Sequence, residues 1–323
     1  MYFLGADVGS LTTKVALIDQ DGQLLFSSYR RNDDGPIAAV QQAFAGIKGA
    51  PGSPAAAGTT GSGRHLAAVM IGADTVVNEI TAHALAARTV EPEVRTVIDI
   101  GGQDSKIIYI KNGVSVGFNM NTVCAAGTGS FLDHQAARLN IAIEEFGDYA
   151  LRATNPVAIA GRCGVFAESD LIHKQQLGYR REDLVAGLCL ALAKNYLTNV
   201  ARNRKIEPVV LFQGGVAANS GIRWALEKLL KVELTIPEHF KVMGAYGAAL
   251  LVRQRFLEGS VKRSAFRGAP AIAESEYRPK GFICDGCANN CEISELYIAE
   301  NLASRWGSRC GKWETDLAGR VPG

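Results

Sequence analysis

The chain has 323 residues, of which 47% are hydrophobic and 20% charged, with a formal net charge of +2. This balance is typical of a globular protein with two domains and a small third one, and it gives no reason to expect nucleic acid as a partner. No apolar run is long enough to span a bilayer, and residues 2–7 read as a strand and not a signal peptide, so we expect a cytoplasmic protein.

The first ninety residues alternate strands with helices. A short apolar strand at residues 2–7 ends in the turn Asp7-Val8-Gly9-Ser10, and strand-like runs follow at 14–18 and 24–29. Helical spacing then appears at residues 36–47 and 78–88. Between these helices, residues 49–58 are rich in glycine, proline, alanine and serine and are interpreted as a connection.

The same layout begins again at residue 94. A strand ends in an Asp-Gly turn, and two strands follow around a Lys-Asn-Gly turn, so the pattern predicts an internal repeat. Helices are expected at 128–139, 165–177, 181–204 and 221–230, strands at 209–212 and 233–235, and a last helix at 244–257. Beyond about Gly259 the composition predicts a polar linker and then a cysteine-rich tail.

Two turns that combine aspartate with glycine are candidates for phosphate binding. The first comprises Asp7, Gly9, Ser10, Thr12 and Lys14, and the second comprises Asp99, Gly101, Gly102 and Lys106. Glycine lets backbone N–H groups approach phosphate oxygens, and aspartate can hold magnesium. One such turn alone would favour a plain hairpin. Two copies, with Gly214-Gly215 after a third strand, favour a nucleotide site.

Other glycine patterns are weaker. The chain has no G-x-x-x-x-G-K-[ST] run, which disfavours a P-loop NTPase. Gly61-x-Gly63 could equally be a turn that opens a helix.

Seven cysteines favour thiolate or metal roles over a disulfide framework. Cys124 and Cys163 lie among small residues just before helical segments, where a helix N-terminus stabilises a thiolate; the alternative is two inert buried cysteines. Cys189, inside an apolar helix, is assigned to the core. Two ligands cannot complete a four-coordinate site, so for a cluster on Cys124 and Cys163 a symmetric dimer that supplies two ligands per subunit is the economical solution.

The tail contains a separate set of cysteines, Cys284, Cys287, Cys291 and Cys310. Their number suits either zinc or an iron–sulfur site, and the sequence leaves both open. The five histidines are scattered and are interpreted as packing or surface residues. Glu168, one helical turn past Cys163, either contributes a hydrogen bond near that cysteine or lies at the surface.

With these residues, the chain resembles the activator ATPases of 2-hydroxyacyl-CoA dehydratases and benzoyl-CoA reductases, within the acetate/sugar kinase–Hsp70–actin superfamily. The resemblance covers residues 1 to about 257. It rests on GADVGSLTTKVALID, TTGSGR, VIDIGGQDSKII, NMNTVCAAGTGSFLD, RCGVFAESD, FQGGVAAN and GAYGAAL. CAAGTGSFLD and CGVFAESD are its most specific parts. The tail stretch CDGCANNCEI resembles regions of longer, fused activase-like proteins.

The resemblance implies an α/β fold of two RNase H-like, actin-like ATPase domains with a nucleotide cleft between them, plus a small cysteine-rich C-terminal tail. The expected domains are residues 1–92, closed by the helix at 244–257; residues 93–243, which carry the cluster cysteines; and residues 259–323.

The resemblance also implies the cofactors, ATP/ADP, Mg²⁺ and one 4Fe–4S cluster shared across a homodimer by Cys124 and Cys163 of each subunit. A second iron–sulfur or zinc site could lie in the tail. Asp7 and Asp99 would organise magnesium and the attacking water, and Lys14 would hold phosphate. The further nucleotide-binding residues would be Gly9, Ser10, Thr12, Gly101, Gly102, Gln103, Gly127, Thr128, Gly129, Gly214, Gly215 and Gly244.

The function implied is ATP-driven transfer of an electron from ferredoxin or flavodoxin to an acyl-CoA dehydratase or reductase in an anaerobic metabolism. The hairpin that precedes Cys124 would couple nucleotide hydrolysis to the cluster. Two alternatives remain open: a small-molecule kinase of the same superfamily, which needs a substrate-facing aspartate base, and a nucleotide-dependent scaffold with a zinc tail.

Overall fold

The computed structural model describes residues 1–47, 53–121, 125–202 and 204–315. The chain forms two compact units, which we call unit 1 (residues 1–85 and 244–323) and unit 2 (residues 86–243). Each unit has a five-stranded sheet of its own and a separate hydrophobic core. Within the described residues, no helix combines the length and the apolar character that crossing a bilayer requires.

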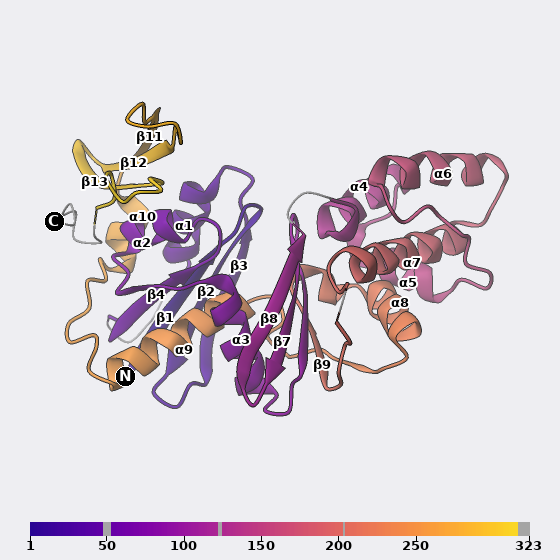
Figure 1. Ribbon diagram of the computed structural model, residues 1–323, viewed down its shortest axis with the longest axis horizontal. Coiled ribbons are helices and arrows are strands. Elements are labelled where there is room, and N and C mark those ends of the chain that lie inside the picture. The colour runs from indigo at the N-terminus through magenta and orange to yellow at the C-terminus, as the bar shows by residue number, and fades with distance from the viewer. Residues whose placement is uncertain (48–52, 122–124, 203, 316–323) are drawn as a thin grey trace. The chain divides into compact units, whose positions relative to one another are not determined.

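Unit 1 is built on a mixed sheet with the strand order β3-β2-β1-β4-β5 (Figure 1). Strand β1 pairs antiparallel with β2 and parallel with β4. The strands are β1 (Tyr2–Val8), β2 (Thr12–Asp19), β3 (Leu24–Arg31), β4 (Ala56–Thr60) and β5 (Thr75–Val76). The helices that begin in this part of the chain are α1 (Pro36–Ala45), α2 (Arg64–Ile71), α3 (Glu79–Val90) and α9 (Met243–Leu257).

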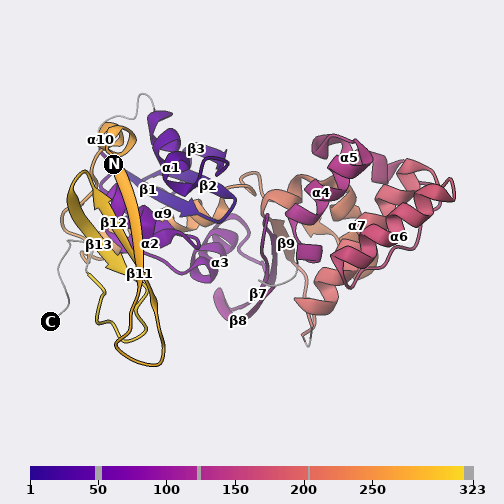
Figure 2. The ribbon, with the colours of Figure 1, turned by 90° about the horizontal axis from the view of Figure 1, so that it is seen from above.

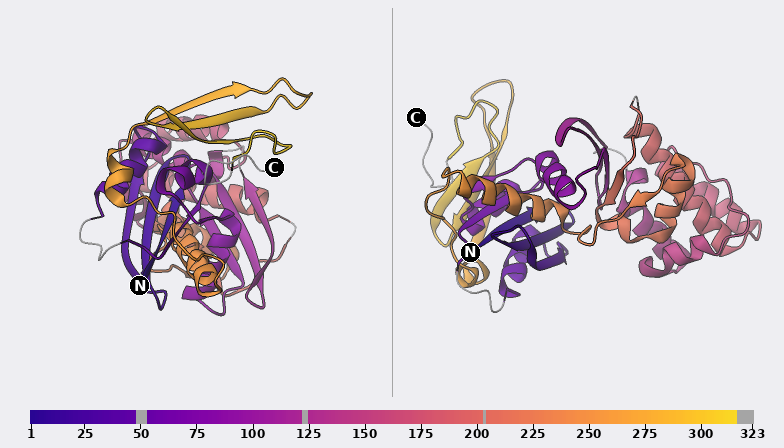
Figure 3. Two further views of the ribbon diagram at one scale, coloured as in Figure 1. Left: turned by 90° about the vertical axis from the view of Figure 1, so that its left-hand side faces the viewer. Right: turned by 90° about the horizontal axis from the view of Figure 1, so that it is seen from below.

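Strand β4 lies partly within the segment that the sequence led us to interpret as a connection. All five of its residues, Ala-Ala-Gly-Thr-Thr, are buried, although alanine and glycine have low strand propensity. The reason is a close approach of helix α9, which runs along the strands (Figure 3). A Cβ at Gly58 would lie 2.9 Å from the Ala248 carbonyl oxygen, and one at Gly5 would collide with the backbone of Ala245. Tertiary packing therefore requires small residues where propensity alone predicts no strand.

Unit 2 repeats this plan with the strand order β10-β9-β6-β7-β8. Strand β6 pairs antiparallel with β7 and parallel with β9, as β1 does with β2 and β4. Its strands are β6 (Thr96–Ile100), β7 (Ser105–Lys111), β8 (Val114–Asn121), β9 (Val210–Gln213) and β10 (Leu234–Thr235). Its remaining elements are η1 (Ala125–Gly127), α4 (Gly129–Leu139), α5 (Ile143–Leu151), α6 (Gly164–Gln176), α7 (Arg181–Asn199), η2 (Gly215–Ala218) and α8 (Ser220–Leu230).

The shared topology confirms the internal repeat and the α/β class that the sequence predicts. In both units the first strand is central, a hairpin strand follows on one side, and a parallel strand from later in the chain lies on the other. Helix α7, which is apolar almost all round, fills the core of unit 2, with Tyr196 fully buried.

Residues beyond Gly259 form more structure than the expected linker. Helix α10 (Ala269–Glu274) packs on α1, and strands β11 (Tyr277–Ile283), β12 (Glu292–Ile298) and β13 (Asn301–Trp306) make a second, antiparallel sheet within unit 1 (Figure 2). The Asp74 carboxylate accepts hydrogen bonds from the Ser264 hydroxyl and the Ala265 N–H, both at 2.7 Å. Such contacts between distant residues leave no local signature, so composition alone indicated a linker.

Candidate functional site

The first Asp-Gly turn lies at the end of β1. Asp7 is directly opposite Lys14 of β2, and the Lys14 Nζ lies 3.2 Å from Asp7 Oδ2. Both side chains are largely buried, so the pair is shielded from solvent. The Gly9 N–H donates to the Thr12 carbonyl oxygen at 2.9 Å and closes the turn. The Ser10 hydroxyl lies 3.5 Å from that of Ser62, which belongs to the turn after β4.

Two glycines make room for the Asp7 carboxylate. Gly61 has φ +94°, and a Cβ there would lie 2.6 Å from Asp7 Oδ1; a Cβ at Gly244 would lie 2.6 Å from Oδ2. Beside Asp7 in the neighbouring strand, Thr60 has a buried Oγ1 with no hydrogen-bond partner among the described residues. Since buried polar atoms normally have partners, this hydroxyl fits a site that binds a ligand or water.

The loop after β3 supports the first turn through a residue that the sequence analysis did not identify. Asn32 Nδ2 donates to the Gly9 carbonyl oxygen at 2.8 Å, and Asn32 Oδ1 accepts from the Thr13 hydroxyl at 2.8 Å. Asn32 therefore orients the turn through its backbone.

The second turn repeats the first in unit 2. Asp99 is directly opposite Lys106, and Lys106 Nζ lies 3.4 Å from Asp99 Oδ2. Lys106 also lies 3.1 Å from the Asp104 carboxylate, and both Asp99 and Lys106 are buried. The Gly101 N–H closes the turn by donating to the Asp104 carbonyl oxygen at 2.9 Å. Each turn thus holds a buried aspartate–lysine pair at a strand end.

Gly214 occupies in unit 2 the place that Gly61 occupies in unit 1. It follows β9, has φ +87°, and a Cβ there would lie 2.5 Å from the Ile100 carbonyl oxygen and 2.7 Å from Asp99 Oδ1. Only glycine combines this left-handed backbone with so close an approach. Gly61 is therefore the counterpart of Gly214, although the sequence around it was also consistent with a plain turn that opens a helix. The recurrence of a glycine directly after a strand in both units is the sequence signal that could have identified it. Gly215 follows as the first residue of η2.

Backbone N–H groups that donate no hydrogen bond lie at both turns and are suited to binding an anion. Because the Gly9 and Gly101 N–H groups close their own turns, the amides that follow are the ones open to a ligand. Within the described part of the chain, the N–H groups of Ser10, Gly102 and Gln103 donate to no acceptor. Adjacent free amides of this kind bind phosphate oxygens.

The second turn is hydrogen-bonded directly to helix α4. The Gly129 and Ser130 N–H groups donate to the Gly101 and Gly102 carbonyl oxygens, each at 2.8 Å, and the Ser130 hydroxyl donates to Gly102 at 2.6 Å. Gly127 ends η1, and the buried Thr128 caps α4 while its hydroxyl donates to the Ala125 carbonyl oxygen at 2.7 Å. The structure therefore brings the Gly127-Thr128-Gly129 stretch onto the second turn.

Cys163 lies at the N-terminus of α6, half-buried and in no disulfide. A Cβ on the next residue, Gly164, would lie 3.9 Å from the Ala126 Cβ, so the start of α6 packs against η1. Cys124 lies outside the described residues, directly before η1 in the sequence. Its predicted role stays a prediction. A free thiol at a helix N-terminus fits an anionic metal ligand.

Asn195 of α7 links the segments on either side of this region. Its Nδ2 donates to the Gly161 and Arg162 carbonyl oxygens at 2.7 and 3.2 Å, and a Cβ at Gly127 would lie 2.9 Å from its Oδ1. Asn195 is only 2% exposed. One buried amide thus fixes the loop before Cys163 and adjoins the turn after η1. No sequence pattern indicates this role, because Asn195 is an isolated polar residue in an apolar helix.

The tail cysteines are placed around the β11–β12 hairpin. The Cys284 N–H donates to the Cys291 carbonyl oxygen at 2.8 Å, and Cys287 and Cys310 are exposed. The Trp313 indole N–H lies 3.2 Å from Cys284 Sγ, and this hydrogen bond lowers the pKa of the Cys284 thiol. In the described residues, no three of the side chains that bind metals converge, so the structure does not assemble the four cysteines. The tail metal site stays a prediction.

The two five-stranded sheets of matching order, each with an Asp-Gly turn, resemble the domains of actin-like ATPases. The solved activator of the 2-hydroxyisocaproyl-CoA dehydratase from Clostridium difficile, with bound ADPNP, superposes with a TM-score of 0.74 at 33% identity, covering 81% of this chain and 99% of that one. This similarity confirms the predicted fold class.

The chain belongs to the BadF/BadG/BcrA/BcrD ATPase family, whose model matches residues 4–252. The (R)-2-hydroxyglutaryl-CoA dehydratase activating ATPase of Acidaminococcus fermentans is 35% identical over 253 residues, which are 77% of this chain and 96% of that protein. The activator of lactoyl-CoA dehydratase of Anaerotignum propionicum is 36% identical over 258 residues, with 77% and 96% coverage. The resemblance to dehydratase activators is thereby confirmed, and residues 253–323 lie beyond the family match.

Proposed function

We propose that this ATPase uses ATP hydrolysis to drive an electron from a ferredoxin- or flavodoxin-type donor onto an acyl-CoA dehydratase or a related reductase. In the proposal, two subunits share one 4Fe–4S cluster, held by Cys124 and Cys163 of each. The relatives named above are dehydratase activators, and one was solved with an ATP analogue. The observation that carries the proposal is the direct hydrogen bonding of the Asp99 turn to helix α4, which follows Cys124.

The two turns would bind ATP and Mg²⁺ through groups of matching chemistry. Asp7 and Asp99 would orient magnesium and the attacking water, and Lys14 would contact phosphate. The free amides of Ser10, Gly102 and Gln103 would receive phosphate oxygens, and Gly214 and Gly215 would lie at the nucleoside end. The unpartnered Thr60 hydroxyl beside Asp7 supports a ligand at this strand end.

The surface around Cys163 supports a dimer. The two residues after Gly164 on α6, Val165 and Phe166, are 70% and 67% exposed. Large apolar side chains that are exposed together, next to a cysteine that would bind the cluster, indicate a surface that a second subunit covers. When bound there, the cluster would supply one-electron redox chemistry. The chain's own part is to hold Cys163 through the Asn195 contacts and to present it at the start of α6.

The link between turn and helix supplies a route for coupling. The carbonyl oxygens of Gly101 and Gly102 accept the hydrogen bonds from Gly129 and Ser130. When a phosphate group leaves the Gly102 and Gln103 amides, the peptide groups of the turn would reorient and these hydrogen bonds would change. Helix α4 and the preceding η1 would then shift against α6.

Anaerobic purification tests the proposal. We expect half a 4Fe–4S cluster, about two iron atoms and two sulfides, per chain in a dimer. Stimulation of a 2-hydroxyacyl-CoA dehydratase should require both ATP and a reductant. Zinc or additional iron would assign a metal to the tail cysteines. A monomer without iron that transfers phosphate to a hydroxyl compound would contradict the proposal and identify a kinase.

Ser130→Ala tests the coupling route. Losing one hydrogen bond of about 1 kcal/mol should leave ATP hydrolysis within about fivefold of the wild type. The number of dehydratase activations per ATP hydrolysed should fall by more than the hydrolysis rate does. Ser275→Ala is the matched control, because its hydroxyl also donates to a backbone carbonyl oxygen at 2.6 Å, in α10. Equal effects of the two variants on that ratio would rule out this route.

A further inference from the structure

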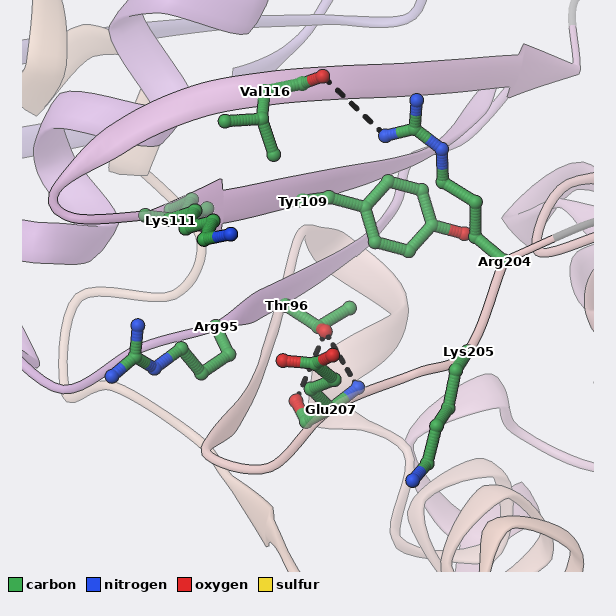
Figure 4. A pocket seen from close by; sticks show the side chains of 9 residues that line it. Arg95, Thr96, Tyr109, Lys111, Val116, Arg204, Lys205 and Glu207 are labelled. Carbon is green, nitrogen blue, oxygen red and sulfur yellow. Dashed lines mark hydrogen bonds between the residues drawn. The ribbon is translucent and has the colours of Figure 1, made fainter.

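Unit 2 contains a basic pocket that the proposed function does not use. The pocket has a volume of about 480 Å³, within the range of sites for small ligands, and it is formed by β6, β7, β8 and the segment before β9. Four of its lining side chains are cations: Arg95, Lys111, Arg204 and Lys205. Figure 4 shows Arg204 and Lys205 on one side of Tyr109 and Thr96, and Arg95 and Lys111 on the other.

The four cations of the pocket outnumber its one carboxylate, that of Glu207. Among the described residues, none of the four cations forms an ion pair. Glu207 also lines the pocket, and its backbone is hydrogen-bonded to Thr96. The Glu207 N–H donates to the Thr96 hydroxyl oxygen at 3.2 Å, and the Thr96 hydroxyl donates to the Glu207 carbonyl oxygen at 3.0 Å. Because cations that share a concave surface repel one another, an anion in the pocket is electrostatically favoured.

Tyr109 provides an independent sign of a ligand. Its side chain is 93% buried, and its hydroxyl oxygen has no hydrogen-bond partner among the described residues. The Arg204 guanidinium lies 5.1 Å from the centre of the Tyr109 ring and donates to the Val116 carbonyl oxygen at 3.4 Å. Gly117, directly opposite Tyr109 in β8, leaves the space that Arg204 fills. A ligand oxygen would satisfy the hydroxyl, whose isolation costs free energy.

We propose that this pocket binds a small polyanion with at least two phosphate groups. Arg204 and Lys205 contact one group, Arg95 and Lys111 contact the other, and the Tyr109 hydroxyl donates to an oxygen between them. Guanidinium groups match the oxygens of phosphate and carboxylate groups in a planar, two-bond geometry, which favours an oxyanion over a simple halide. Phosphate carries more negative charge per group than carboxylate and therefore balances the four cations better. The proposal is independent of the electron-transfer function.

Residue-resolved acetylation of lysines tests the proposal on the complete chain. The protein is treated with an acetylating reagent, with and without inorganic pyrophosphate, and each lysine is followed by peptide mass spectrometry. Pyrophosphate should slow modification of Lys111 and Lys205 in a saturable manner and leave Lys228 on α8 unchanged. Lys14 reports the first turn separately, so binding at the nucleotide residues is not mistaken for binding in the pocket.

Substitutions of pocket residues test whether the protection of Lys111 and Lys205 from acetylation depends on the pocket. Arg204→Gln should raise the apparent Kd for pyrophosphate about tenfold, and Tyr109→Phe about threefold. The control is Arg152→Gln, because Arg152 also lies over a tyrosine ring, Tyr149 at 4.5 Å, outside the pocket. Loss of protection in Arg204→Gln but not in Arg152→Gln supports the site.

Parallel titrations distinguish the sources of the phosphates. ADP and coenzyme A are compared with pyrophosphate at equal concentrations, and the compound that protects Lys111 and Lys205 at the lowest concentration identifies the class of ligand. The proposal is supported when pyrophosphate, ADP or coenzyme A protects these lysines in the wild type and this protection is lost in Arg204→Gln. Absence of protection by all three, or equal losses in Arg204→Gln and Arg152→Gln, overturns it.

Discussion

Cys163→Ser is expected to yield a protein with less than about a tenth of the wild-type iron, because an iron–sulfur cluster needs its thiolate ligands. Dimers should weaken along with the cluster, while ATP binding remains, since Cys163 lies outside both Asp-Gly turns. Iron and sulfide analysis, sedimentation and nucleotide titration on anaerobically purified protein measure the three quantities.

The control for this variant is Cys189→Ala. Cys189 is fully buried in α7, where burial raises the pKa of its thiol well above the usual range, so it remains protonated and cannot act as a ligand at neutral pH. This variant should retain iron. Normal iron content in Cys163→Ser, or equal loss in both variants, would remove Cys163 from the cluster.

Asp99→Asn should reduce ATP hydrolysis by about a hundredfold or more, because it neutralises the carboxylate that we expect to orient magnesium and water. The same change leaves the buried Lys106 with Asp104 as its remaining carboxylate partner in the turn. Stability should therefore fall by about 1–3 kcal/mol, less than when a buried charge loses its whole pairing. Steady-state hydrolysis and urea unfolding separate the two effects.

Asp104→Asn distinguishes a role in ATP hydrolysis from simple pairing with Lys106. The Asp104 carboxylate lies 3.1 Å from Lys106 Nζ, closer than that of Asp99 at 3.4 Å, but the Asp104 side chain is 34% exposed. If Asp99 acts on the nucleotide, Asp104→Asn should lower hydrolysis far less than Asp99→Asn does. Comparable losses would show that the charge balance of Lys106, and not the position of Asp99, determines the activity.

The sequence predicted the parts of the fold that have a local signature. The recurrence of strand, Asp-Gly turn and hairpin identified both sheets, and the apolar run at residues 97–100 marked the strand that ends at the second turn. Strand β4 was missed because its alanines and glycine are small to accommodate α9. The sheet of β11 to β13 was missed because its apolar residues, such as Leu296, are buried against parts of unit 1 that are distant in the sequence.

The residues of the candidate site also fall into those with a local sequence signature and those without one. Asp7 and Asp99 were predicted because each precedes a glycine turn near the end of a strand, and Lys14 because it follows the first turn; their roles stay predictions. Asn32 and Asn195 were missed, since each acts on backbone groups that are distant in sequence, the Gly9 and Gly161 carbonyl oxygens. Sequence patterns identify the groups expected to touch a ligand, whereas the residues that orient them emerge only from tertiary contacts.

The surroundings of Asp7 have a mechanical consequence. Gly244, against which Oδ2 of Asp7 lies, is the first residue of unit 1 after the chain returns from unit 2, and a Cβ there would also lie 3.2 Å from His83 Nε2, two residues before the chain leaves at Leu85. The chain crosses between the units within helix α3 and at the start of helix α9. Because Gly244 lies against Asp7 and close to His83, a ligand that displaces the Asp7 side chain acts next to both of these helices.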